Sequence, residues 1–242
     1  MGKELKPDLL FLGRSVSIGK FNLISLAILF IAFAITISLR ITLGSDSQYS
    51  AVPWYYPWFL AVPQLLLLGL VLSFATSGYE GAAYGYEGIR HFFRKPTTQG
   101  WVSDSMLTVV LSVGAILLYS FGLYKFDIAY LKPPQVPKDI LGDGTFVLVN
   151  LFAITIWVPF VEEFFFRGLL LNVWAIYYGE IKSIFLVSLI FMLVHANPGL
   201  YIPVFISSLL ISFLFIKTGT IWAPFLSHAV QNLLVVVVAA SA

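Results

Sequence analysis

The sequence predicts an all-α, polytopic integral membrane protein with about eight helices. Two observations predict this fold class. Of the 242 residues, 59% are hydrophobic and only 11% are charged, whereas a soluble domain carries about 25% charged residues. Most of the chain also divides into apolar windows of about 20 residues, the length of a membrane-spanning helix. We therefore expect residues 1–242 to form a single membrane domain that is embedded in lipid.

The first three expected helices lie in the N-terminal half of the chain. Each is an apolar window bounded by Gly, Pro or charged residues. Residues 1–20, which precede the first window, are basic and are expected to form a cytoplasmic tail. The first window is too long for the apolar region of a cleaved signal peptide. The three windows are residues 21–43, 54–76 and 105–124.

The next apolar region, residues 146–178, has a length that suits two helices. Pro159 lies inside it. Because proline lacks an amide hydrogen and its ring clashes with the preceding turn, Pro159 predicts a kink or junction. We expect one helix to end near Pro159 and a second helix to carry Arg167 onward.

Three further helices are expected, at residues 183–195, 200–216 and 221–239. Between the first two, Asn197-Pro198-Gly199 predicts a reverse turn, with proline at its second position and glycine supplying a positive φ at its third. His195 is therefore expected at the end of a helix, near a membrane face.

The distribution of Lys and Arg in the short loops indicates a cytoplasmic N-terminus. Four basic residues lie in the tail and three in the loop after the second helix, whereas residues 44–53 contain none. On this topology, the helix ending near Glu162 and the helix ending at His195 both finish on the cytoplasmic side. Residues 78–103, which mix Gly, Tyr and basic residues, are expected to lie at the membrane interface, with a role in substrate gating as the alternative.

Composition also excludes several classes of protein. The 14 Lys and Arg residues nearly balance the 12 Asp and Glu residues, so the chain lacks the basic surface that binds nucleic acid. It contains no cysteine. Disulfides, thiolate metal sites and cysteine nucleophiles are therefore excluded.

A few polar side chains interrupt the apolar C-terminal helices. An ionisable group inside lipid costs about 2.5–3.5 kcal/mol on insertion scales, so each one needs a partner or a function. Within the last hundred residues the candidates are Glu162, Glu163, Arg167, His195 and His228, together with the amide of Asn232.

Glu163 and Arg167 are four positions apart, the spacing of a salt bridge on one helix face. We interpret them as a structural pair. Glu162 points about 100° away from Glu163 around the helix and has no cation of its own. It is therefore the candidate general base.

His228 and Asn232 are also four positions apart, so both project from one stripe of the last helix. Two neutral donors aimed at one point in a dry cavity would stabilise an oxyanion formed from a peptide carbonyl. Each histidine taken singly is typical of a packing residue. Together with Asn232 they form a set in which Glu162 and His195 activate the attacking water.

Three short motifs in this region resemble those of the CAAX protease and bacteriocin-processing family, also called the CPBP or ABI family. That family includes the prenyl-protein endopeptidases of the Ras-converting-enzyme type. The resemblance covers residues 160–232, about a third of the chain. Its motifs are EExxxR at residues 162–167, FxxxH at residues 191–195 and HxxxN at residues 228–232.

The resemblance implies a glutamate-dependent membrane endopeptidase whose catalytic helices lie within residues 145–240. It would hydrolyse a peptide bond near the cytoplasmic membrane face, and its substrate would be a peptide or a prenylated protein C-terminus. In the family scheme the first Glu and the FxxxH His activate water, the last His and Asn form the oxyanion hole, and the second Glu and the Arg brace the site. In this sequence these residues are Glu162 and His195, His228 and Asn232, and Glu163 and Arg167.

The resemblance favours catalysis without a metal or other cofactor. A zinc site of two histidines and one glutamate is the alternative, because catalytic zinc takes three protein ligands and an open position. The sequence has no HExxH motif, so the ligands would come from separate helices.

Two other classes of function stay open at this point. The chain could be a non-proteolytic membrane scaffold or immunity-type protein of the same fold. It could also be a proton-coupled transporter that uses Glu162 and His195 as a relay, because intramembrane carboxylates serve that purpose too.

Overall fold

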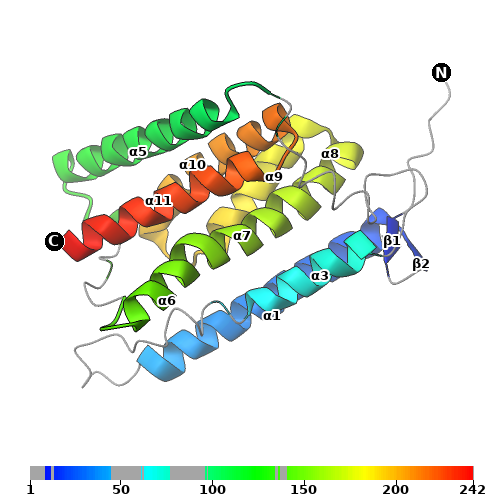
Figure 1. Ribbon diagram of the computed structural model, residues 1–242, viewed down its shortest axis with the longest axis horizontal. Coiled ribbons are helices and arrows are strands. Elements are labelled where there is room, and N and C mark those ends of the chain that lie inside the picture. Colours follow the sequence, from blue (N-terminus) through cyan, green and yellow to red (C-terminus); the bar gives the residue numbers. More distant parts are fainter. Residues whose placement is uncertain are drawn as a thin grey trace.

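The protein is a bundle of apolar helices, seen here in a computed structural model (Figure 1). The structure describes residues 9–11, 14–44, 61, 63–76, 96, 98–133, 136 and 141–241. A short antiparallel ribbon, β1 (Leu9–Phe11) with β2 (Arg14–Val16), precedes the helices. The α-helices are α1 (Ile18–Gly44), α3 (Gln64–Thr76), α5 (Trp101–Lys125), α6 (Phe146–Phe152), α7 (Val158–Glu163), α8 (Asn172–Tyr178), α9 (Glu180–Leu193), α10 (Pro198–Thr218) and α11 (Trp222–Ser241).

Shorter helical segments complete the chain. A 3-10 turn, η1 (Ala129–Leu131), follows α5. Two π-helical segments, η2 (Ala153–Trp157) and η3 (Phe164–Leu171), lie on either side of α7. They join α6, α7 and α8 into one helical rod of 33 residues, Phe146–Tyr178.

Within the part of the chain that the structure describes, five helices are long and apolar enough to cross a membrane, which agrees with the predicted multi-pass membrane protein. They are Ile18–Leu39, Trp101–Lys125, Phe146–Tyr178, Pro198–Thr218 and Trp222–Ser241. The second expected helix is described from Gln64 onward, as α3; its earlier residues lie outside the described part of the chain. Most of residues 78–103 also lie outside it, so their interfacial placement stays a prediction.

The predicted end of a helix near Pro159 is wrong, because one helical rod continues through it, with a change from the π to the α register at Val158. The Val158 N–H donates to the Ala153 carbonyl, five residues back, which is the π register. In that register the Ile154 carbonyl would accept from residue 159, which is proline and has no N–H. The wider π turn of η2 therefore accommodates Pro159, and the helix continues.

One rod in place of two helices changes the expected topology. Glu162 lies in the middle of the rod rather than at a helix end. The earlier inference that Glu162 and His195 both finish a helix on the cytoplasmic side is therefore wrong for Glu162. The cytoplasmic placement of the N-terminus, counted from charges alone, stays a prediction.

The turn between α9 and α10 also differs from the expected one. Asn197 caps α10, because its side chain accepts from the Gly199 N–H at 2.9 Å, and Pro198 is the first helical residue. The positive φ in this connection belongs to Ala196, at 50°. Gly199 is needed for a different reason: a Cβ there would overlap the backbone of Lys132, just after η1.

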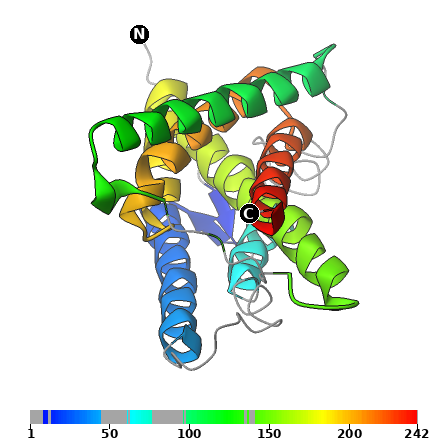
Figure 2. The same ribbon diagram turned by 90° about the vertical axis from the view of Figure 1, so that its left-hand side faces the viewer.

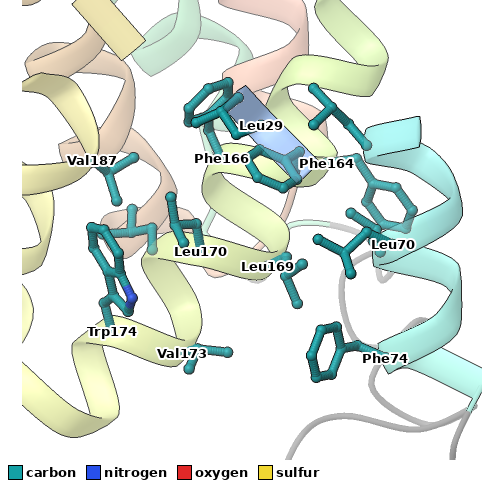
Figure 3. Packing of buried hydrophobic residues seen from close by; sticks show 14 of the residues in the cluster. Leu29, Leu70, Phe74, Phe164, Phe166, Leu169, Leu170, Val173, Trp174 and Val187 are labelled. Atoms are coloured by element: carbon teal, nitrogen blue, oxygen red, sulfur yellow. The ribbon is translucent and has the colours of Figure 1, made fainter. Parts of the chain in front are cut away.

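The helices pack in layers around the long rod. In both views α1 and α3 run side by side along one edge and α5 lies along the opposite edge, with the rod, α10 and α11 between them (Figures 1 and 2). The buried core centres on η3, whose side chains are all buried. Leu169 faces Leu70 and Phe74 of α3, while Leu170 lies on the other side toward Val187 of α9 (Figure 3).

Candidate active site

The two adjacent glutamates occupy the end of α7, between the two π segments. Glu163 is fully buried, whereas the side chain of Glu162 keeps 19% of its surface exposed. A change of helical register on both sides of one turn is typical of functional sites, because it re-aims side chains without breaking the helix. The EE pair therefore lies at a specialised turn in the middle of the rod.

The predicted pairing of Glu163 with Arg167 is confirmed. The Arg167 guanidinium donates from Nη1 to Glu163 Oε1 at 3.0 Å, and both side chains have 0% exposure. Nη2 of Arg167 donates to Ser208 of α10, to Oγ at 2.7 Å and to the carbonyl oxygen at 3.2 Å. The guanidinium also lies over the Phe191 ring, 4.7 Å from its centroid. This ion pair therefore links the rod to both α9 and α10.

His228 of α11 contacts both glutamates. Its Nδ1 donates to Glu163 Oε1 at 2.8 Å, because a carboxylate that is paired with Arg167 can only accept. Its Nε2 lies 3.7 Å from Glu162 Oε2, too far for a direct hydrogen bond. The sequence predicted His228 near the site but not its bond to Glu163, because that bond joins residues 65 positions apart.

His195 follows the last turn of α9, and its ring contacts the ring of Phe191. Its Nδ1 donates to the Phe191 carbonyl at 2.7 Å, which makes Nε2 the acceptor nitrogen of the neutral ring. The Phe191 ring lies 4.9 Å from the His195 ring and 5.9 Å from the His228 ring, measured between centroids. Phe191 therefore holds His195 at the level of the Arg167 and His228 side chains.

Asn232, one turn after His228, reaches the rod at another point. Its Nδ2 donates to the Ile154 carbonyl at 2.9 Å. This is the carbonyl that Pro159 cannot pair. Asn232 thus has a structural partner in η2, and one of its two N–H donors is used there.

Two residues of this cluster were not foreseen from the sequence. Ser208 shares Arg167 with Glu163, and Gln64 of α3 donates from Nε2 to Glu162 Oε1 at 3.2 Å. Gln64 interrupts a run of apolar residues, so the same rule that singled out the C-terminal polar residues would have found it. A serine in an apolar helix carries no such signal, because it often bonds its own backbone.

The described residues do not form the group of three ligands that the alternative zinc site would need. Among the residues that the structure describes, no three His, Asp or Glu side chains are grouped so that they could hold a metal ion. His195 contacts Phe191, while Glu162 and His228 face each other. A zinc site would therefore need a different arrangement of these side chains.

Comparison with known proteins gives one match. A sequence model of the type II CAAX prenyl endopeptidase Rce1-like family matches residues 144–234, which include all three motifs. The searches of curated proteins and of solved structures gave no match. The family match confirms, for this C-terminal part of the chain, the resemblance to the CAAX-type membrane proteases.

Proposed function

We propose that the chain is a membrane endopeptidase that hydrolyses a peptide bond with a water molecule activated by Glu162 and His195. One observation carries the proposal. Inside apolar helices, Glu162 is partly exposed beside a fully buried and charge-paired Glu163. A carboxylate in lipid needs a partner or a function. Glu163 has Arg167 as its charge partner. Glu162 has no such cation among the described residues, and a role as general base accounts for its presence.

Glu162 is the proposed general base. Its Oε2 and His228 Nε2 are 3.7 Å apart, a separation that a hydrogen-bonded water can bridge. Glu162 would take a proton from the attacking water while the water oxygen bonds to the carbonyl carbon of the substrate. His195, with Nε2 as its acceptor nitrogen, would accept a hydrogen bond from the same water during the attack, and Glu162 would then return its proton to the leaving amine as the C–N bond breaks.

The hydrogen bonds of Glu163 would keep His228 in place. Glu163 Oε1 accepts hydrogen bonds from both Arg167 and His228. This one oxygen therefore connects the EExxxR motif to the HxxxN motif. The pairing with Arg167 compensates the charge of Glu163. Glu163 and Arg167 therefore orient the site and do not take part in proton transfer.

We assign the oxyanion to donors on α11. Asn232 uses one N–H for the Ile154 carbonyl, and its second N–H is the donor that we assign to the developing oxyanion. His228 lies one turn away on the same helix; because its Nδ1–H is used by Glu163, it would donate to the oxyanion only from Nε2 of the doubly protonated ring. The family description leads us to propose a prenylated protein C-terminus as substrate.

Cleavage of a quenched, farnesylated CAAX peptide by the detergent-purified protein tests the proposal. We expect chelator-insensitive cleavage that falls at least about 100-fold in Glu162→Ala and in His195→Ala, the scale of general acid–base catalysis. Glu180→Gln, which changes an exposed glutamate at the start of α9, is the control. Full activity in Glu162→Ala would end the hypothesis, and loss of cleavage with chelator would restore the zinc alternative.

A further inference from the structure

Gln64 is a buried polar residue at the first position of α3, a helix of otherwise apolar character. It is 9% exposed, and its Nε2 donates to Glu162 Oε1 at 3.2 Å. The two residues are 98 positions apart. Gln64 also lies outside residues 144–234, the part that matches the family. The N-terminal helices thus contribute a side chain to the candidate site.

The contacts of Gln64 argue against a stabilising role. Its Oε1 is buried and has no hydrogen-bond partner among the residues that the structure describes. A buried acceptor that is not paired is unfavourable, and an apolar side chain of the same shape would avoid this cost. Gln64 is therefore explained by what its N–H does for Glu162 rather than by what it adds to folding.

The two oxygens of Glu162 have different surroundings. Oε1 accepts from Gln64, while Oε2 faces Nε2 of His228 at 3.7 Å. The neutral N–H of Gln64 holds one carboxylate oxygen and leaves the negative charge of Glu162 in place. A Lys or Arg donor would neutralise that charge. The carboxylate is thereby fixed in one orientation, with Oε2 turned toward the place where the attacking water would bind.

We propose that Gln64 is a positioning residue for the reaction, holding Glu162 Oε1 so that Oε2 accepts the proton of the water. The proposal rests on the function proposed above. It extends the site to α3, so that residues from both halves of the chain would be needed for catalysis.

Gln64→Met tests the proposal, because methionine keeps the length of the side chain and removes the donor. With the farnesylated peptide we expect kcat to fall about 10- to 100-fold with KM unchanged, the effect of losing one hydrogen bond to a charged group. The melting temperature should change by no more than about 4 °C, because removing the unpaired Gln64 Oε1 offsets the loss of the donor to Glu162, whose side chain keeps 19% of its surface exposed. Leu65→Met, at a position 51% exposed on the same helix turn, is the matched control. Wild-type kcat in Gln64→Met, or equal losses in both variants, would overturn the proposal.

A second measurement does not depend on cleavage. Infrared difference spectra between the wild-type protein and Glu162→Gln would identify the carboxyl band of Glu162. We expect this band to shift in Gln64→Met and to stay in place in Leu65→Met. An unshifted band would overturn the contact even in an active enzyme. If the band shifts in Gln64→Met but the wild-type protein cleaves no peptide, the contact would stand and the proposed function would be refuted.

Discussion

The buried pair of Glu163 and Arg167 should dominate the stability of the C-terminal helices. Arg167 has 0% exposure and contacts Glu163, Ser208 and the Phe191 ring. Glu163→Gln keeps an acceptor at the same place and removes the charge. Because one partner of a fully buried pair is then left uncompensated, the expected loss is about 3–5 kcal/mol. For a chain of this size the melting temperature changes by about 2–4 °C per kcal/mol, so it should fall by about 6–20 °C.

The chain contains a matched pair for comparison. Lys217 and Asp104 join α10 to α5 at 2.8 Å, about the same separation as the buried pair, but their side chains are 59% and 23% exposed. An exposed ion pair contributes about 0–1 kcal/mol. Asp104→Asn should therefore lower the melting temperature by no more than about 4 °C.

Thermal unfolding of the two variants in the same detergent, followed by circular dichroism, measures both effects. The buried pair also has further partners, namely Ser208, the Phe191 ring and His228, so the comparison tests burial and these contacts together. If Glu163→Gln melted no lower than Asp104→Asn, the bracing role of Glu163 and Arg167 would be refuted.

Two further predictions concern the backbone around the site. Gly199→Ala should lower the melting temperature, because the new Cβ would overlap the Lys132 carbonyl group, whereas Gly122→Ala, which meets nothing within 4 Å, should leave it unchanged or raise it. Pro159→Ala supplies an N–H in α7 that can donate to the Ile154 carbonyl of η2, so Asn232→Ala should cost less stability in that background than in the wild type. The melting temperatures of the two single variants and the double variant measure the coupling. Strictly additive shifts would contradict the assignment of Asn232 to the carbonyl that proline leaves unpaired.

Apolar windows predicted most of the helices, because lipid makes length and hydropathy decisive. The described helices α5, α10 and α11 contain the windows predicted for them, apart from Ile221 at the start of α11. The helix end expected near Pro159 was wrong, because the missing N–H and the ring clash of proline do not show that a π turn will accommodate the ring. Hydropathy marks apolar windows but does not show how neighbouring helices pack. It also could not show that Gly199 is required by a neighbour, since the Lys132 backbone is distant in sequence.

Within the site, local spacing predicted local contacts and missed the long-range ones. The pairing of Glu163 with Arg167 follows from four positions on one helix and is confirmed. The bond from His228 to Glu163 and the bond from Gln64 to Glu162 join separate helices. Such contacts depend on how helices pack against one another, which a pattern within one helix does not contain.

The motifs lie at similar distances along the helices from the turns that connect them, and these distances follow from residue counts in the sequence. The chain reverses between α8 and α9 at Gly179, which has a φ of 85°. Glu163 precedes Gly179 by 16 positions and His195 follows it by 16. At 1.5 Å per helical residue, each lies about 24 Å from the turn. α9 has only 14 residues, so its end, with His195, stops at the level of the glutamates instead of crossing the whole bilayer.

The helix pair α10 and α11 can be measured from its turn in the same way. α10 and α11 reverse after Gly219, which has a φ of 61°. Ser208 precedes this glycine by 11 positions and His228 follows it by 9, which places the two side chains about 16 Å and 14 Å from the turn. Both bond to the ion pair of Glu163 and Arg167. Two glycine reversals and the residue counts on either side of them therefore bring the three motifs to one depth, and helix packing then selects which side chains touch.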